Sequence, residues 1–503
     1  MSQIRRQSII SSVVVYIGFA LGLFNTYLFT RQGGFTTEQY GLTNMFMAIA
    51  TLMLCFSSLG MSSYVYKFYP YYKDNLPDDK NDLFSWALVG SLVGFILVIT
   101  GGIVFKDLVI RKYGEHAPGL ITYYNWIFPF GLGLNLFSIL EAYAWQVKKS
   151  VFSNFLREVQ FRIFTTIMVV LTTTGIITSF DTFIKLYSFT FLAIATILLF
   201  DLLYTRQLHF HFSISRVTIK FRKKILTLIA FIYGGSLVFT ISSVFDSLVI
   251  AAVLDNGLAK AGIYALALNI ASLIQAPQRA VVSSSIPVLS RAWKEKYMAQ
   301  INRIYHRSSL NMLLFAIGMF MLLWLNFTDG VFTFKLKQEY LDAKWVFFLI
   351  GLSRIIDMGT GVNGQIISTS TFWRFDFLTG LVLVVITLPF NYILTKKMGI
   401  TGPAIANLGS FFIYNFIRYI YLLKKFRMQP FTAKTAYTLL LGILAFYTTW
   451  LLFDSKHGFS WLVIRSTFFL AIYIGGAFLF KLSPDLEPVL RVIQKRMGIK
   501  KGD

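Results

Sequence analysis

The stretch ILTLIAFIYGGSLVFTISSVFDSLVIAA, residues 225–252, sets the class of fold. It is long enough to cross a bilayer, whose hydrocarbon core takes about 20 consecutive apolar residues in a helix. It contains no Lys or Arg, and a basic run comes directly before it: Lys220, Arg222, Lys223 and Lys224. This arrangement predicts a transmembrane helix whose basic end faces the cytoplasm. Asp246 lies inside the stretch, and an ionisable residue at that depth is by default a candidate functional residue.

Similar apolar stretches recur along the whole chain. Of the 503 residues, 56% are hydrophobic and 14% are charged, whereas about a quarter are charged in a typical soluble protein. The mean hydropathy is +0.63. We therefore predict an all-α polytopic membrane protein with about fourteen transmembrane helices. Their approximate limits are residues 8–29, 41–66, 83–105, 119–144, 161–179, 183–204, 225–252, 259–288, 308–327, 343–368, 374–394, 401–423, 433–453 and 461–480.

The basic residues are distributed unevenly between alternate loops. With the N-terminus in the cytoplasm, 31 of the 47 Lys and Arg residues fall in inner segments and 12 in outer ones. This excess predicts that both termini are cytoplasmic. It also accounts for the net charge of +24 without a nucleic-acid partner, and we expect none. The remaining four lie within spans: Arg279, Arg354, Arg418 and Arg465.

The loops restrict the possible functions. No loop between predicted spans is long enough to hold a soluble catalytic or nucleotide-binding domain. No phosphate-binding motif of the type G-x-x-x-x-G-K-[ST] is present, which argues against direct ATP-driven transport. Cys55 is the only cysteine, and His209 and His211 have no third candidate ligand nearby, so we expect neither a disulfide nor a metal site. We do not expect an enzyme.

The first two spans align without gaps with spans 7 and 8 when the chain is shifted by 221 residues. Asn25 then falls on Asp246, and the identical positions include Phe24 with Phe245, Gly41 with Gly262, and Ser62-Ser63 with Ser283-Ser284. The shift passes six helices, an even number, so the two copies would run the same way through the bilayer. We predict an N-terminal lobe at 1–215, a C-terminal lobe at 216–430, and two further helices with a basic cytoplasmic tail at 431–503.

Several segments, in this order, resemble bacterial polysaccharide transporters. They are EQYGL at 38–42, LGMSSYVYKFYP at 59–70, Asp246 followed by AGIY at 261–264, NYIL at 391–394 and GITGPAIAN at 399–407. The chain is similar over essentially its whole length to the O-antigen and lipid-linked oligosaccharide flippases of the multidrug/oligosaccharidyl-lipid/polysaccharide exporter superfamily. Pro403 departs from the small residue usual there, but proline costs little in the first turn of a helix.

The resemblance implies a function and a location. It implies alternating access by two six-helix lobes. The cargo would be an undecaprenyl-pyrophosphate-linked oligosaccharide crossing the bacterial inner membrane during surface polysaccharide synthesis. Its implied partners are this substrate, membrane lipids and polysaccharide polymerase or assembly proteins, and we expect a monomer.

Candidate cavity residues lie in five spans. A sugar headgroup needs a polar cavity to replace its water, and its pyrophosphate needs a cation, best supplied by Arg. The candidates are Arg279 and Gln275 in span 8, Arg354 and Asp357 in span 10, Asp246 in span 7, Glu141 in span 4 and Asn25 in span 1.

Structural roles remain open for several of these residues. Asp246 is also compatible with helix packing. Arg354 and Asp357, three residues apart on one helix face, are also compatible with a salt bridge. We expect Arg418 and Arg465, near span ends, to extend to the membrane surface. Arg157, Glu158 and Arg162 are expected to line the inner mouth or the bilayer surface.

The energy source is open. Asp246 or Glu141 could take up H⁺, or Asp246 could bind Na⁺ with Ser242 and Ser243, and no other cofactor is expected. Two alternatives belong to the same superfamily, a cation-coupled multidrug exporter and a peptidoglycan-precursor flippase. A drug exporter would have a more acidic cavity. A third is a membrane-embedded polysaccharide polymerase or glycosyltransferase, which would need a sizeable catalytic loop.

Overall fold

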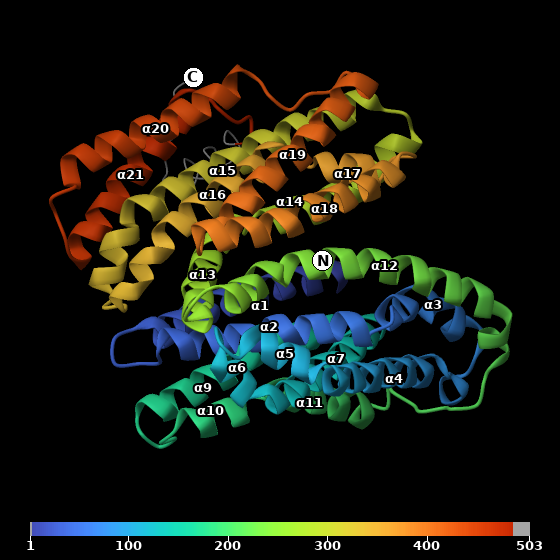
Figure 1. The fold of residues 1–503 in the computed structure, drawn as a ribbon. Helices are drawn as coiled ribbons and strands as arrows, with labels where there is room; N and C mark the ends of the chain where they lie inside the picture. The colour runs from blue at the N-terminus through green and yellow to red at the C-terminus, as the bar shows by residue number, and fades with distance from the viewer. Residues whose placement is uncertain (1–2, 486–503) are drawn as a thin grey trace. The chain divides into compact units, whose positions relative to one another are not determined.

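The structure, a computed structural model, describes residues 3–485, and in that range the chain is helical with no β-strand (Figure 1). Each of the fourteen predicted stretches falls on one or more helices, so the prediction of an all-α fold is confirmed. Nine described helical segments are long and apolar enough to cross a membrane. They are Val13–Thr30, Thr37–Ser57, Asp78–Val104, Tyr124–Gln146, Phe180–Tyr204, Met298–Thr333, Arg374–Met398, Ala433–Phe453 and Phe459–Leu479. The number fourteen stays a prediction, and the basic tail from residue 486 lies outside the described range.

The chain divides into two compact units, Met1–Gly262 and Ile263–Asp503, and α13 (Gly257–Ser272) runs across the division. The first unit contains α1 Gln3–Thr30, α2 Thr37–Ser57, α3 Met61–Asn75, η1 Asp78–Lys80, α4 Leu83–Val104, α5 Lys106–Tyr113, α6 Pro118–Thr122, η2 Tyr124–Trp126, α7 Ile127–Gln146, α8 Ser150–Phe155, η3 Leu156–Gln160, α9 Phe161–Thr173, α10 Phe180–Tyr187, α11 Thr190–Tyr204 and α12 Arg216–Val253.

Within this unit, α7 packs against α2, α3, α4 and α11. Small residues bring the backbones together, as is usual between membrane helices. A Cβ on Gly94 of α4 would lie 2.1 Å from the Ser57 carbonyl oxygen of α2, and one on Gly133 of α7 would lie 2.3 Å from the Leu192 nitrogen of α11. The long α12, predicted to begin the second lobe, packs against α2 and α3 (Figure 1). The lobe boundaries at 215 and 430 stay a prediction.

The second predicted span is broken. Helix α2 ends at Ser57, and α3 begins at Met61 after a turn in which Gly60 has φ +72°. That left-handed backbone conformation favours glycine because it has no Cβ. The eighth predicted span is broken as well, between α13 and α14 (Gln278–Lys294), where Pro277 precedes the first residue of α14. Both halves of the predicted repeat therefore share a broken second span.

The second unit contains, after α14, the helices α15 Met298–Thr333, η4 Gln338–Asp342, α16 Ala343–Gly359, α17 Asn363–Ser368, α18 Trp373–Met398, α19 Thr401–Phe426, α20 Ala433–Phe453 and α21 Phe459–Leu479. Helix α19 packs against α16 and α18, and the C-terminal pair α20 and α21 packs against α15 (Figure 1). In that last contact Phe469 and Tyr473 of α21 are buried with Ile317 of α15 and Ala445 of α20. Gly442 allows the close approach, because a Cβ there would lie 2.4 Å from the Ile317 side chain.

Candidate functional site

The first polar cluster lies in the first unit and contains the predicted candidate Glu141. This carboxylate on α7 accepts a hydrogen bond of 2.7 Å from Nη1 of Arg157. The Glu141 side chain is 5% exposed and the Arg157 side chain is 51% exposed. The second carboxylate oxygen, Oε1, is buried without a hydrogen-bond partner among the described residues. A buried carboxylate needs such a pairing, and here it holds a guanidinium that remains accessible to a ligand.

A local irregularity of the backbone places Arg157. Residues 156–160 form a π-helical turn, η3, between α8 and α9. Such turns insert an extra residue into a helix and are frequent at functional sites. Helix α1 lies directly on this turn, because a Cβ on Gly18 would be 2.7 Å from the Glu158 carbonyl oxygen. One turn further on, Arg162 Nη1 donates to the Glu158 carboxylate at 2.8 Å.

Two aromatic residues accompany this ion pair. Tyr66 of α3 and Trp145 of α7 are both exposed, and their ring centroids are 5.7 Å apart. Trp145 is held in place by a hydrogen bond of 3.1 Å from its Nε1 to Ser153. Trp145 follows Glu141 by four residues on α7, so the two side chains lie on the same face of that helix. A cation and exposed aromatic faces thus occur together, and they suit a ligand that carries both an anionic group and apolar ring faces.

Asn25 belongs to a helix contact. It is buried on α1, its Nδ2 donates to the Arg162 carbonyl oxygen at 2.9 Å, and its Oδ1 accepts from Thr166 Oγ1 at 2.5 Å. Both ends of the amide are used to join α1 to α9.

Asp246, the counterpart of Asn25 in the predicted repeat, is buried on α12. Ser243, a suggested Na⁺ ligand beside it, donates to the Thr240 carbonyl oxygen at 2.7 Å within the same helix.

The second polar cluster lies in the second unit and centres on Asp357. Its carboxylate accepts from Gln278 Nε2 at 2.8 Å and from Asn415 Nδ2 at 3.3 Å. The Asn415 side-chain oxygen accepts in turn from Thr360 Oγ1 at 2.8 Å and Asn363 Nδ2 at 2.9 Å. These bonds connect α14, α16, α17 and α19 through neutral donors.

The suggested salt bridge between Arg354 and Asp357 is absent, although both residues lie in the described range. The amides of Gln278 and Asn415 occupy the carboxylate instead. The Arg354 guanidinium lies 5.8 Å from the Phe411 ring, and its Nε is buried without a hydrogen-bond partner among the described residues.

Arg279 and Gln275 flank the start of α14. Arg279 is exposed, and it makes no ion pair or hydrogen bond through its side chain to any residue that the structure describes. It directly follows Gln278, whose side chain reaches Asp357. Gln275 lies half-buried in the turn between α13 and α14. Arg279 is therefore a second accessible guanidinium, in a different unit from Arg157.

The prediction that Arg418 and Arg465 reach the membrane surface is wrong. Arg418 is buried, donates to Asp376 of α18, and lies 3.8 Å from the Tyr414 ring. Arg465 is 4% exposed and donates to Asp329 of α15. Each arginine stays inside because a neighbouring helix supplies a carboxylate. Sequence reasoning missed Asp329 and Asp376, although a carboxylate inside an apolar stretch was the available signal.

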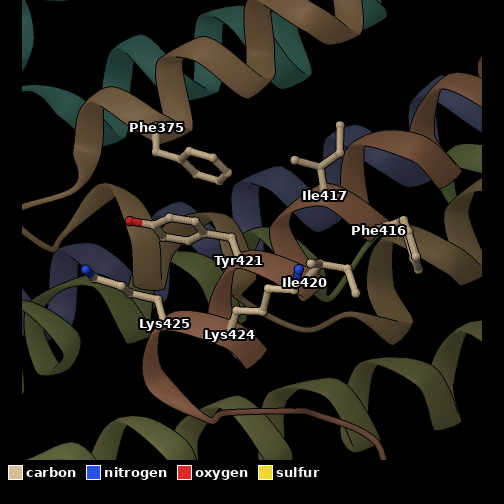
Figure 2. Close-up of a pocket in the computed structure, with 7 residues that line it drawn as sticks. All are labelled: Phe375, Phe416, Ile417, Ile420, Tyr421, Lys424 and Lys425. Atoms are coloured by element: carbon tan, nitrogen blue, oxygen red, sulfur yellow. The ribbon is translucent and has the colours of Figure 1, made fainter.

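An apolar groove of about 490 Å³ runs along α18 and α19 (Figure 2). Phe375 and Tyr421 stack there with ring centroids 3.8 Å apart. The remaining walls are Phe416, Ile417 and Ile420, and Lys424 and Lys425 complete the lining. Such a surface suits a lipid chain better than a sugar headgroup.

Over residues 3–485, no three His, Cys, Asp or Glu side chains are grouped so that they could hold a metal ion.

Residues 4–293, more than half of the chain, match the family described as polysaccharide biosynthesis protein. The chain belongs to this family. No curated protein matches the sequence.

Solved structures of transporters share the fold of this polysaccharide biosynthesis protein family member. One is the lipid II flippase MurJ in an inward closed conformation, with 18% identity and a TM-score of 0.73 over 94% of this chain and 98% of that one. Another is an inward-facing multidrug resistance MATE family transporter of the MOP superfamily, with 15% identity and a TM-score of 0.61 over 82% and 97%. A third is a mutant form of the Vibrio cholerae MATE transporter VcmN, with 14% identity and a TM-score of 0.55 over 84% and 96%. The chain is thus a multi-pass membrane protein with a MurJ- and MATE-like fold.

Proposed function

We propose that the chain moves a lipid-linked oligosaccharide, carried on undecaprenyl pyrophosphate, across the bacterial inner membrane by alternating access. The translocated oligosaccharide would be used for the synthesis of a surface polysaccharide, such as O-antigen, capsule or exopolysaccharide. The observation that carries the proposal is the Glu141–Arg157 pair, in a chain that belongs to the polysaccharide biosynthesis protein family. A half-exposed guanidinium beside exposed Tyr66 and Trp145 suits a ligand made of a phosphate and sugar rings.

Transport of this cargo needs both the guanidinium and the aromatic residues of this site. Moving hydroxyls and a pyrophosphate through hydrocarbon without replacing their water costs several kcal/mol for each polar group. Arg157 in the first unit and Arg279 in the second are each accessible, and each is proposed separately as a phosphate contact. A planar guanidinium donates two parallel hydrogen bonds to phosphate oxygens, which a lysine cannot do.

The remaining parts of the proposal complete the transport cycle. Asp246 or Glu141 would bind the coupling ion, either H⁺ or Na⁺. Both termini would face the cytoplasm, and the protein would act as a monomer with polymerase or assembly proteins nearby. The apolar groove at Phe375 and Tyr421 offers a surface for lipid.

A peptidoglycan-precursor flippase is the second candidate. The observation that favours it is the fold match with the lipid II flippase MurJ, which covers 94% of this chain. Both candidates move a glycan on a lipid carrier, and they differ in the glycan. The MATE structures, with TM-scores of 0.61 and 0.55, support the multidrug alternative less.

The proposal is tested in cells that lack the gene and depend on a plasmid copy for surface polysaccharide. Arg279→Ala and Asp246→Asn should abolish surface glycan while the protein still inserts in the membrane at normal level. Arg291→Ala is the matched control, because Arg291 is exposed on the same helix as Arg279 and its side chain donates to Glu295 at 2.8 Å. Wild-type amounts of surface polysaccharide in both variants would contradict the proposal, as would equal loss in the control.

A further inference from the structure

A pocket of about 200 Å³ lies in the first unit, where α2 ends and α3 begins. Most of its lining residues carry a hydroxyl group. Ser58, Ser62 and Ser63 come from the helix break, Ser138 from α7, and Tyr233 and Thr240 from α12. The Tyr233 hydroxyl donates to the Phe56 carbonyl oxygen at 3.2 Å, which ties α12 to the end of α2 beside the pocket. The left-handed turn at Gly60 separates Ser58 from the two serines that follow.

The described lining of the pocket carries no formal charge. Among the lining residues that the structure describes, none is Asp, Glu, Lys, Arg or His. A cation or an anion would thus lose its water without gaining an opposite charge, which is costly. The chemistry of the lining therefore favours a neutral ligand that is itself rich in hydroxyl groups.

Four of the hydroxyl groups are available for a ligand. In the described range, Ser62, Ser63, Ser138 and Thr240 make no side-chain hydrogen bond. Helical Ser and Thr commonly donate to a carbonyl three or four residues back, as Thr51 does in this same pocket, to Met47 at 2.7 Å. Each unused hydroxyl offers one donor and two acceptor positions, which matches the mixed donors and acceptors of a sugar.

The size of the pocket also suits a single sugar residue. Its volume equals that of about six or seven water molecules at roughly 30 Å³ each, which is comparable with a single sugar ring. It is too small for a whole oligosaccharide. We propose that this pocket binds one neutral sugar residue of the cargo headgroup, with Ser62, Ser63, Ser138 and Thr240 bonding to its hydroxyls.

This assignment deepens the proposed function and rests on it for the biological role. Binding itself does not depend on transport. The pocket would select for sugars, whereas Arg157, in the same unit, would contact the pyrophosphate. A variant of the pocket should therefore weaken recognition of the sugar without affecting binding of an anion.

The test uses purified full-length protein in detergent and two probes. Methyl glycosides of hexoses and N-acetylhexosamines are followed by saturation-transfer proton NMR. Inorganic pyrophosphate, which has no carbon-bound hydrogen, is followed by the broadening of its phosphorus-31 NMR signal. Ser62→Ala with Ser63→Ala should weaken glycoside binding about tenfold or more, the equivalent of about 1.4 kcal/mol. Thr240→Val, on another helix, should act in the same direction, so the test does not depend on one variant folding. Pyrophosphate binding should change less than twofold, by roughly 0.4 kcal/mol at most.

The matched control is Ser283→Ala with Ser284→Ala, the corresponding pair of the predicted repeat. Those hydroxyls donate to the Ala280 and Val281 carbonyl oxygens of their own helix, so the control should bind glycosides like the wild type. The pocket assignment is overturned if the wild type binds no glycoside, or if pocket and control variants bind alike. If the wild type binds glycosides through the pocket but moves no lipid-linked glycan in vesicles, the proposed function fails and the pocket assignment stands.

Discussion

The two serine pairs that the predicted repeat places in register are used differently. Ser62 and Ser63, at the start of α3, line a pocket and keep their hydroxyls free of bonds to the described residues. Ser283 and Ser284, near the start of α14, are exposed and donate to carbonyl oxygens of their own helix. Each pair follows a break in the second helix of its half. The pairs lie at different places in their helices. Ser62 and Ser63 are in the first turn of α3, where no helical carbonyl lies three residues back, whereas Ser283 and Ser284 are the sixth and seventh residues of α14 and can bond within it.

The charged residues of the two units also have different roles. In the first unit, buried Glu141 holds a half-exposed Arg157. In the second unit, Asp357 is bonded by neutral amides, and Arg465 is buried with Asp329. We infer that the first unit presents charge to a ligand, whereas much of the charge in the second unit holds helices together. Three substitutions test this contrast, and a fourth tests the turn beside the serine pocket.

The largest effect is expected at Arg465. Arg465→Met would leave Asp329 buried without its guanidinium, and breaking a buried ion pair costs about 3–5 kcal/mol. The free energy of unfolding, measured by SDS titration in mixed micelles, should fall by that amount. Arg465→Met combined with Asp329→Leu should recover much of the loss, because an apolar pair of similar volume removes the unpaired charge. A small effect of the single variant would mean that this pair does not hold α15 to α21.

Arg157→Gln should instead reduce transport. The amide can still bond to Glu141, but the charge offered to the pyrophosphate is lost, and charge-assisted bonds are worth about 1.5–3 kcal/mol. Initial rates in vesicles should therefore fall roughly 10- to 150-fold. Some stability is also lost, because Glu141 is buried, but less than in Arg465→Met, since Arg157 is half-exposed and the amide still donates. A loss of stability as large as at Arg465, with unchanged transport by the folded fraction, would reverse the contrast between the units.

Asp357→Asn should cost stability. The new amide presents a donor to either Gln278 or Asn415, each of which already donates, and one buried donor loses its acceptor at about 1–3 kcal/mol. Unfolding in micelles would show this loss, and transport per folded molecule should stay within threefold, or roughly 0.65 kcal/mol. If transport stops while stability is kept, Asp357 contacts cargo or a coupling ion and its polar cluster is not merely structural.

Gly60→Ala should have the smallest effect. Its φ of +72° costs a residue with a Cβ about 1–2 kcal/mol. The same unfolding measurement applies, with Gly101→Ala as control, because a Cβ at Gly101 meets no atom within 4 Å and alanine is the better helix former. If Gly60→Ala is as stable as the control, the turn between α2 and α3 is not fixed by this residue.

The sequence predicts helix positions well because a bilayer imposes length and apolarity on each span locally. The break after Ser57 is not visible in that signal, since the stretch stays largely apolar across it, whereas the break after Ser272 falls in a segment that contains Gln275, Pro277 and Arg279. Gly60 and Pro277 were the available hints. The π-helical turn at residues 156–160 has no recognisable sequence signal and depends on how α1, α8 and α9 pack.

Pairings are harder to predict than positions. The sequence identifies Glu141 as a candidate but assigns its partner Arg157 to the mouth or bilayer surface, because helices of unknown register separate one charge from the other. Spacing along one helix suggests that Arg354 pairs with Asp357, yet donors from other helices bind that carboxylate. Contacts between helices depend on rotation and register, which one sequence does not determine.

Translocation of a fluorescent undecaprenyl-pyrophosphate-linked oligosaccharide in proteoliposomes of purified protein measures the proposed activity itself. Flipping is read from the fraction of label that becomes accessible to a membrane-impermeant quencher. We predict that the wild type moves the lipid-linked glycan, that Arg157→Gln and Arg279→Ala do so at least tenfold more slowly, a loss of about 1.4 kcal/mol, and that Arg291→Ala matches the wild type. Equal rates in protein-free vesicles and in vesicles with the wild type would contradict the proposed function.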